Sequence, residues 1–182
     1  MTFTHISFFI LSMPLFALPV LGKTARPDSA QNIIRAAITE AQSSEKNVLL
    51  IFHATWCGWC KRLETALNDT TVKSLIDRNY IIARLDVKER GDKIQTHENP
   101  GGQNLLAEFG GDNAGLPFIV FLNGKGKMIA NSNVMPDKQN IGYPGSKEEI
   151  NAFTKLLKKT ASNITSKQLD VIQNYFEAHA PK

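Results

Sequence analysis

Two short runs of consecutive apolar residues lie near the centre of the chain. Between them, apolar residues recur with the spacing of a helix. The run Val48–His53 is apolar and partly β-branched, which is typical of a strand buried on both faces. After it, Leu63 and Leu67 lie one helical turn apart with charged residues on the other side, which predicts an amphipathic helix. A short helix at 71–78 then leads into the second apolar run, Tyr80–Val87. This order predicts two parallel strands joined by a right-handed crossover.

Apolar residues at every third or fourth position predict further helices at both ends of the chain. The first is capped by Asp28 or Ser29 and ends near residues 43–44. Two more begin near the C-terminus with capping boxes, in which a hydroxyl and a side chain three positions later bond to each other's backbone. These boxes are Ser146 with Glu149 and Thr165 with Gln168.

Turn residues divide the region between these helices. Residues Lys88–Gly102 are polar and form a longer connection than usual, which predicts a loop that shapes access to the two cysteines at 57 and 60. His97 in this loop is either a ligand or base, or a surface histidine. A short helix at Asn104–Phe109 ends at two glycines, as a left-handed cap requires. The turn Asn123–Lys127 predicts an antiparallel hairpin between its flanking strands.

The N-terminal residues have the pattern of an export signal. Ile6–Leu21 is apolar, contains two prolines and is shorter than the about 20 residues needed to cross a bilayer. Val20–Gly22 offers a cleavage site. We therefore expect a signal peptide at 1–22 and a periplasmic or otherwise exported mature chain without stable membrane insertion. Met1–His5 lacks the usual lysine or arginine, so an uncleaved anchor or an apolar tail is the alternative.

Composition fits one domain over residues 23–182. The chain of 182 residues is 42% hydrophobic, which can fill a single core. Its net charge of +4 comes wholly from residues after the leader, where basic and acidic residues are interspersed. Because no stripe combines basic and aromatic residues, a nucleic-acid partner is not supported.

Cys57 and Cys60 are the only cysteines and lie three positions apart. Such a pair is a redox couple or half of a metal site, and a pair of inert buried thiols is the alternative. Disulfides persist in an exported protein, but a bridge across so short a loop restrains the unfolded chain little. Redox function is therefore the better explanation of the pair.

The predicted position of Cys57 suits a nucleophile, because it falls where the strand ends and the helix begins. The first N–H groups of a helix lack internal partners and carry the positive end of its dipole, so they favour an anion. The thiolate is the reactive form of cysteine. Cys57 is therefore expected to attack, and Cys60, one turn inside the helix, to resolve the resulting mixed disulfide.

The segment Phe52–Arg62, Phe-His-Ala-Thr-Trp-Cys-Gly-Trp-Cys-Lys-Arg, resembles the active-site segment of the thioredoxin superfamily. It is most similar to exported bacterial thioredoxin-like proteins with tryptophan between the cysteines, and the resemblance spans residues 30–160. It implies an α/β thioredoxin fold, with a central mixed sheet flanked by helices. The helix at 165–179 would be an addition to that fold. The resemblance also implies thiol-disulfide oxidoreductase activity without a cofactor, with protein disulfides as substrates.

The resemblance assigns supporting roles to residues around the cysteines. The Leu116–Pro117 peptide bond should be cis and lie beside the sulfur atoms, whereas a trans proline at a strand entrance is the alternative. The exposed backbone at Leu116 could pair with an extended substrate segment. Trp56 and Trp59 would form an apolar rim for substrates. The pair Gly58–Trp59 between the cysteines does not define whether the protein reduces, oxidises or isomerises disulfides.

Three positions depart from the family pattern or modify it. Thioredoxins carry a buried aspartate six residues before the first cysteine, where this chain has Ile51. Glu64 could accept the proton of Cys60 in its place, or a water could do so; an exposed helix residue is the other interpretation of Glu64. His53 either lowers the pKa of Cys57 or merely bonds to backbone at the strand end.

The leading hypothesis is an exported thiol-disulfide oxidoreductase that acts as a reductase and receives electrons from a membrane partner. The alternative is a copper- or zinc-binding module that uses His53, Cys57 and Cys60. A closed zinc site requires four ligands, and the chain has no second cysteine pair. A third hypothesis is an interaction scaffold in which the cysteines are incidental.

Overall fold

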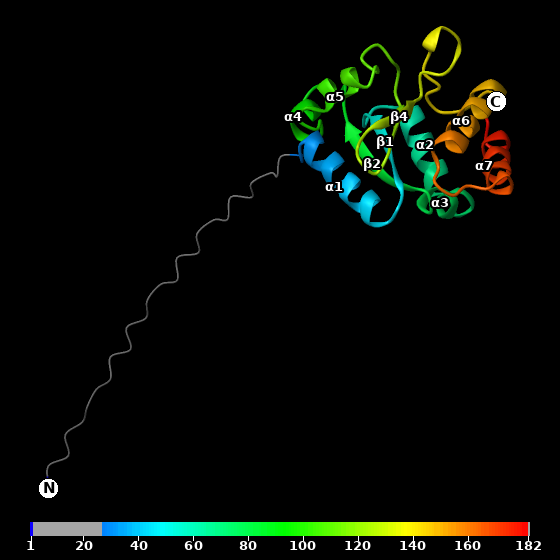
Figure 1. Cartoon of the computed structure of the whole chain (residues 1–182). Coiled ribbons are helices and arrows are strands. Elements are labelled where there is room, and N and C mark those ends of the chain that lie inside the picture. The colour runs from blue at the N-terminus through cyan, green and yellow to red at the C-terminus, as the bar shows by residue number, and fades with distance from the viewer. Residues whose placement is uncertain (2–26, 182) are drawn as a thin grey trace.

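The computed structural model describes Met1 and residues 27–181 (Figure 1), so the predicted signal peptide lies outside the described residues except for Met1. A four-stranded sheet with the order β2-β1-β3-β4 forms the centre of the fold. Its strands are β1 (Asn47–His53), β2 (Tyr80–Asp86), β3 (Phe118–Leu122) and β4 (Met128–Asn131). The helices are α1 (Ala30–Ser43), α2 (Gly58–Asn68), α3 (Thr70–Asp77), α4 (Lys93–Thr96), α5 (Gly102–Glu108), α6 (Lys147–Thr160) and α7 (Ser166–Ala178), with a 3₁₀ turn η1 (Pro136–Lys138).

The sheet is mixed, as predicted. β1 pairs in parallel with β2, where Asn47 is opposite Tyr80 and His53 is opposite Asp86. β1 also pairs antiparallel with β3, and β3 pairs antiparallel with β4 across the hairpin turn. The predicted parallel pair and the predicted hairpin are both confirmed. Since β1 and β2 are parallel, the C-terminal ends of the two strands lie at the same edge of the sheet.

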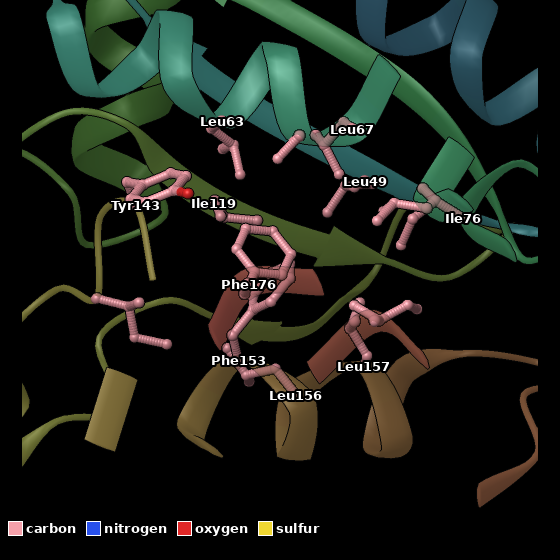
Figure 2. Close-up of a cluster of buried hydrophobic side chains, with 14 of the residues drawn as sticks. Leu49, Leu63, Leu67, Ile76, Ile119, Tyr143, Phe153, Leu156, Leu157 and Phe176 are labelled. Atoms are coloured by element: carbon pink, nitrogen blue, oxygen red, sulfur yellow. The ribbon is translucent and has the colours of Figure 1, made fainter. Parts of the chain in front are cut away.

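Alternation along β1 divides the core into two layers. Leu49 and Ile51 point to the face covered by α2, α3, α6 and α7, whereas Leu50 and Phe52 point to the face covered by α1 and α5. Figure 2 shows the first of these layers, in which leucines of α2 and α6 converge around aromatic rings. The buried run predicted as a two-faced strand is therefore buried as expected, with every residue from Val48 to Phe52 at most 4% exposed.

The predicted helix caps are present. Ser29 caps α1, and both capping boxes begin the two C-terminal helices α6 and α7. The additional helix α7 packs against the domain, because its residues Leu169, Ile172 and Phe176 are all at most 5% exposed. The ring of Phe176 lies 5.4 Å from that of Phe153 on α6, in an edge-to-face arrangement. No helix among the described residues is both long and apolar enough to span a membrane.

The prediction of a loop without helix at Lys88–Gly102 is wrong, because this segment contains the helical turn α4. The N–H of His97 closes this turn by donating to the carbonyl of Lys93, 2.9 Å away. The following helix also begins earlier than predicted, at Gly102, because Gly101 adopts φ +82° and turns the chain into it. A side chain at Gly102 would meet Val87 Cγ1 at 3.0 Å, so the absence of one permits this close approach.

Candidate redox site

Cys57 forms the boundary between β1 and α2. It is the N-cap of α2, and its Sγ accepts a hydrogen bond from the Cys60 N–H at 3.1 Å. The two residues form a disulfide, with their Cα atoms 5.3 Å apart and their exposed fractions at only 4% and 6%. In the reduced protein this N–H and the helix dipole would stabilise a thiolate on Cys57. The arrangement therefore has the geometry of a redox couple.

The loop before β3 packs against this disulfide. The Leu116–Pro117 peptide bond is cis, which confirms the expectation from the family resemblance. Cys57 Sγ lies 3.5 Å from the carbonyl oxygen of Leu116, and Leu116 packs on the small apolar cluster that contains Ala54 and both cysteines. Residues 59 positions apart along the chain thus meet at the sulfur atoms.

Two polar residues that the sequence did not indicate hold this loop. Asn140 Nδ2 donates to the carbonyl oxygens of Gly115 and Pro117, at 2.8 and 3.0 Å. Ser132 is fully buried, donates from its hydroxyl to Asn140 Oδ1 at 2.6 Å and accepts from the Ile119 N–H at 2.9 Å. Neither residue belongs to a motif, so no sequence signal could have found them.

The motif's two tryptophans, one before Cys57 and one between the cysteines, are both exposed. Trp56 is 43% exposed, donates from Nε1 to the Lys88 carbonyl at 2.8 Å and lies under the Arg90 guanidinium at 3.9 Å. Trp59 is 50% exposed and stacks on Tyr143, with ring centroids 5.9 Å apart. Gly58, the first residue of α2, faces open space. Both tryptophans are therefore exposed, and their role as a rim for substrates stays a prediction.

A groove runs from Trp59 along the loop that carries the cis proline. It is lined by Trp59, Leu116 and Tyr143 and by Pro181 near the end of the chain. The carbonyl of His179 accepts from the Tyr143 hydroxyl at 3.5 Å, so the residues after α7 form one wall of the groove.

Glu89 is a further residue that the sequence analysis missed. It is only 6% exposed, although it is charged, and it follows β2 in the segment interpreted as a loop. Its carboxylate accepts from the Thr55 N–H at 2.5 Å and from the Thr55 hydroxyl at 2.9 Å. Lys93 Nζ also donates to that hydroxyl at 3.0 Å. The segment after β2 therefore fixes the residue that immediately precedes the redox motif.

The structure places the two suggested pKa modulators near β2. His53 Nε2 lies 3.6 Å from Asp86 Oδ1, and Glu64 Oε1 lies 3.9 Å from Arg84 Nε. The Glu64 side chain is 55% exposed, whereas that of Asp86 is 25% exposed. His97 is an exposed residue whose Nδ1 lies 2.8 Å from the Thr96 hydroxyl, which agrees with the surface interpretation.

Asp86 has an unusual environment for a carboxylate. Its Oδ1 atom is buried and has no hydrogen-bond partner among the described residues. Burial raises the pKa of Asp86 above its ordinary value, and nearby His53 opposes this shift. Sequence patterns could not have singled out this residue, because an aspartate at a strand end is common.

The predicted metal ligands do not converge. Within residues 27–181, no group of three or more histidine, cysteine or acidic side chains is arranged to hold a metal ion. The disulfide also occupies both sulfur atoms that a soft metal would require as thiolates. The set of His53, Cys57 and Cys60 proposed for copper or zinc is therefore not assembled in this structure.

The mixed sheet, the disulfide at a helix N-terminus and the cis proline beside it define a thioredoxin-fold protein with a redox motif. A family model described as Thioredoxin-like matches residues 29–124, which is more than half of the chain. The chain belongs to the thioredoxin-like family. The predicted fold is confirmed, and the expected enzyme class, a thioredoxin-like oxidoreductase, agrees with this membership.

Several known proteins are similar to this chain. "Protein disulfide isomerase-like 1-1" of Arabidopsis thaliana is 30% identical over 107 residues, which cover 59% of this chain and 21% of that protein. A protein disulfide-isomerase of Ricinus communis is 48% identical over 44 residues, covering 24% of this chain and 9% of that protein. The chain thus spans about a fifth or less of the length of these relatives.

Among solved structures, a disulphide isomerase from Xylella fastidiosa Temecula1 has a TM-score of 0.50 with this chain. The two are 20% identical, and the match covers 90% of this chain and 98% of the other. At this identity the likeness supports the fold alone.

Proposed function

We propose that this protein is an exported thiol-disulfide oxidoreductase that reduces disulfides in protein substrates. The observation that carries the proposal is the arrangement of the two cysteines. Cys57 Sγ accepts a hydrogen bond from the Cys60 N–H at the N-terminus of α2, and the two sulfur atoms are close enough to form a disulfide. A cysteine that is only structural would not require a helix N-terminus, whereas a nucleophilic thiolate gains from one.

The reaction proceeds by two exchanges. The Cys57 thiolate attacks one sulfur of a substrate disulfide, which forms a mixed disulfide and releases the other substrate sulfur as a thiolate. Cys60 then loses its proton and attacks Cys57 Sγ. This second step forms the Cys57–Cys60 disulfide and releases the remaining substrate sulfur. Two electrons pass from the cysteine pair to the substrate.

The surface around Cys57 suits an extended polypeptide. Trp56 and Trp59 offer exposed aromatic area within the redox motif. The backbone at Leu116 lies beside Cys57 and can pair with a substrate strand, while side chains of the substrate enter the groove by Tyr143. Protein disulfides, rather than small-molecule disulfides, are therefore the proposed substrates.

The direction of electron flow depends on two opposing effects. The N–H at Cys57 Sγ stabilises the thiolate and so the dithiol form, which favours oxidation of substrates. Burial of both sulfur atoms favours the uncharged disulfide, which makes the dithiol a better reductant. We propose that burial prevails. The relatives named as isomerases do not decide the direction, because this chain matches so little of their length.

Export is supported by the sequence of the leader. An apolar run with a cleavage site at Val20–Gly22 precedes a domain whose only cysteines are the redox pair. In an oxidising compartment the reductase would need a membrane electron donor to restore its dithiol.

The test is a Cys57→Ser variant in an insulin-reduction assay driven by dithiothreitol. We expect the variant to lose all activity above the uncatalysed rate, whereas Cys60→Ser should accumulate a mixed disulfide with the substrate. Unchanged activity of Cys57→Ser would favour the scaffold hypothesis. Equilibration of the wild-type cysteine pair with glutathione then tests the direction of electron flow. A reductase should have a reduction potential of about −270 mV, and an oxidase one of about −120 mV.

A further inference from the structure

The attack of Cys60 on the mixed disulfide requires a base. The position that carries a buried aspartate in thioredoxins is occupied by Ile51 in this chain. Cys60 must lose its proton before it can attack, because only the thiolate is nucleophilic. Its side chain is buried, with 6% exposure, so bulk water has little access to it. Ile51, which lies on the same face of β1 as α2, carries no proton acceptor. The acceptor must therefore come from another element.

The geometry of α2 and β2 places Asp86 and Cys60 towards the same edge of the sheet. The chain reverses at Cys57, so α2 runs back along β1, and β2 is parallel to β1. Glu64 Oε1 on α2 lies 3.9 Å from Arg84 Nε on β2, so these two residues lie at a similar level along the sheet. Towards the shared edge, Cys60 lies about 6 Å before Glu64 along the helix, and Asp86 lies about 6.6 Å beyond Arg84 along the strand. The step from Glu64 to Cys60 and the step from Arg84 to Asp86 therefore both lead towards the edge of the sheet at which β1 and β2 end.

The backbone of Asp86 is held by hydrogen bonds, whereas one oxygen of its carboxylate accepts none from the described residues. Asn99 fixes its backbone from both sides, by accepting from the Asp86 N–H at 2.7 Å and donating to the Asp86 carbonyl at 3.0 Å. Asn99 itself is only 8% exposed and is anchored to the Asp28 carbonyl at 2.9 Å. In the part of the chain that the structure describes, Oδ1 of Asp86 is buried without a hydrogen-bond partner, and His53 Nε2 at 3.6 Å is beyond hydrogen-bonding distance. A lone pair is therefore free to accept a proton.

We propose that the Asp86 carboxylate accepts the proton of Cys60 during resolution, and that His53 is a positioning residue for that carboxylate. This inference rests on the proposed oxidoreductase function. The Cys60 S–H bond breaks, the proton passes to Asp86, and the new thiolate attacks Cys57 Sγ. The bond between Cys57 and the substrate breaks, and the departing substrate thiolate takes up a proton from solvent.

The surrounding charges favour this role. Burial raises the pKa of Asp86, and the carboxylates of Glu89, in the segment after β2, and Glu64, on α2, raise it further. His53 on β1 and His97 beyond α4 act in the opposite direction. A carboxylate with a raised pKa is a stronger base than an exposed one, which reduces the free-energy difference for taking a thiol proton.

The test compares two steps in wild type and Asp86→Asn. Cys57 is first loaded with 5-thio-2-nitrobenzoate as a mixed disulfide, and release of the coloured thiolate reports attack by Cys60. We expect Asp86→Asn to slow this release about 100-fold at neutral pH, since a positioned base contributes about that much or more. Alkylation of reduced Cys57 by iodoacetamide should stay within about twofold of wild type, because Asp86 acts on the second step. Release at wild-type rate in Asp86→Asn would overturn the inference.

The pH profile separates a base from a merely structural residue. Release by the wild type should rise with pH as Asp86 ionises, and Asp86→Asn should lose this rise. His53→Gln removes the opposing positive charge, so the rise should move to higher pH. The exposed matched control Asp170→Asn on α7 should keep the wild-type profile. If Glu64→Gln loses the rise and Asp86→Asn keeps it, Glu64 is the acceptor and the inference fails.

Stability provides the remaining control. Because burial raises the pKa of folded Asp86, its ionisation costs stability as the pH rises through that pKa. Asp86→Asn should therefore unfold at a higher temperature than wild type at pH 7, and this difference should shrink below the unfolded pKa of about 3.9. A slower release together with a lower unfolding temperature would count against the inference. A wild-type protein that neither alkylates faster than free cysteine nor releases the thiolate would overturn the proposed function itself.

Discussion

Trp56 and Trp59 belong to one short motif and are almost equally exposed, but the surfaces that support them differ. Trp56 rests on polar groups: its Nε1 donates to the Lys88 carbonyl, and the Arg90 guanidinium lies 3.9 Å from its ring. Trp59 rests on the Tyr143 ring, 5.9 Å away. The first surface comes from the segment after β2, and the second belongs to the aromatic core.

The aromatic side of the site continues deep into the domain. Tyr143 packs on Phe176 of α7 at 5.8 Å, and Phe176 packs on Phe153 of α6 at 5.4 Å. Figure 2 shows these rings between α2 and α6. The polar side instead depends on a few directed bonds, above all those of Glu89 to Thr55. Loss of the aromatic support should therefore lower global stability more than loss of the polar support, which should also disturb the motif itself.

The largest expected effect is on the aromatic side. Phe176→Ala should lower the free energy of unfolding by about 3–5 kcal/mol, because it leaves a cavity where a fully buried ring contacts α6 and Tyr143. Urea denaturation measures this loss. Val171→Ala on the same helix is the control, since Val171 is 40% exposed and should change stability by less than about 0.5 kcal/mol. A loss of only the control's size would mean that α7 is dispensable for the core.

An intermediate effect is expected on the polar side. Glu89→Ala removes the acceptor of the Thr55 N–H and should cost about 1–3 kcal/mol in urea denaturation. It should also slow insulin reduction, because the residue before the motif loses its support. Glu108→Ala, at an exposed position on α5, should leave both measurements unchanged. If Glu89→Ala matches this control, the segment after β2 does not organise the motif.

The smallest effect separates the two tryptophans directly. Arg90→Ala should cost about 0.5–1 kcal/mol, as a cation–π contact does at an exposed site, and added salt should reduce the difference from wild type. Arg62→Ala is the matched variant, since Arg62 lies over Trp59 at the longer distance of 5.4 Å. It should cost less. Equal losses from the two arginines would contradict the distinction between a polar and an aromatic support.

The sequence was sufficient where local patterns determine structure. The apolar run of β1, the hairpin turn and the capping boxes depend on neighbouring residues, and all are found as predicted. The cis proline was also expected, but only through the family resemblance. The motif itself identified Cys57 and Cys60 because no other cysteines compete with them.

The residues that the sequence did not reveal act across long separations. Glu89 supports Thr55 over 34 positions, and Asn140 holds the Pro117 carbonyl over 23 positions. Asp86 gains its environment only when β2 pairs with β1 beside α2. Each is a common residue type in an ordinary local context, so its role depends on tertiary packing that no periodicity encodes. The turn α4 was missed because four residues give no measurable helical period.

The groove wall formed by the residues after α7 has a practical consequence. Pro181 lines the same hollow as Trp59 and Leu116, so a peptide fused behind it would emerge at the groove proposed for substrates. A purification handle fused there would therefore compete with incoming polypeptides. The choice of which terminus to extend thus becomes an enzymological decision for this protein.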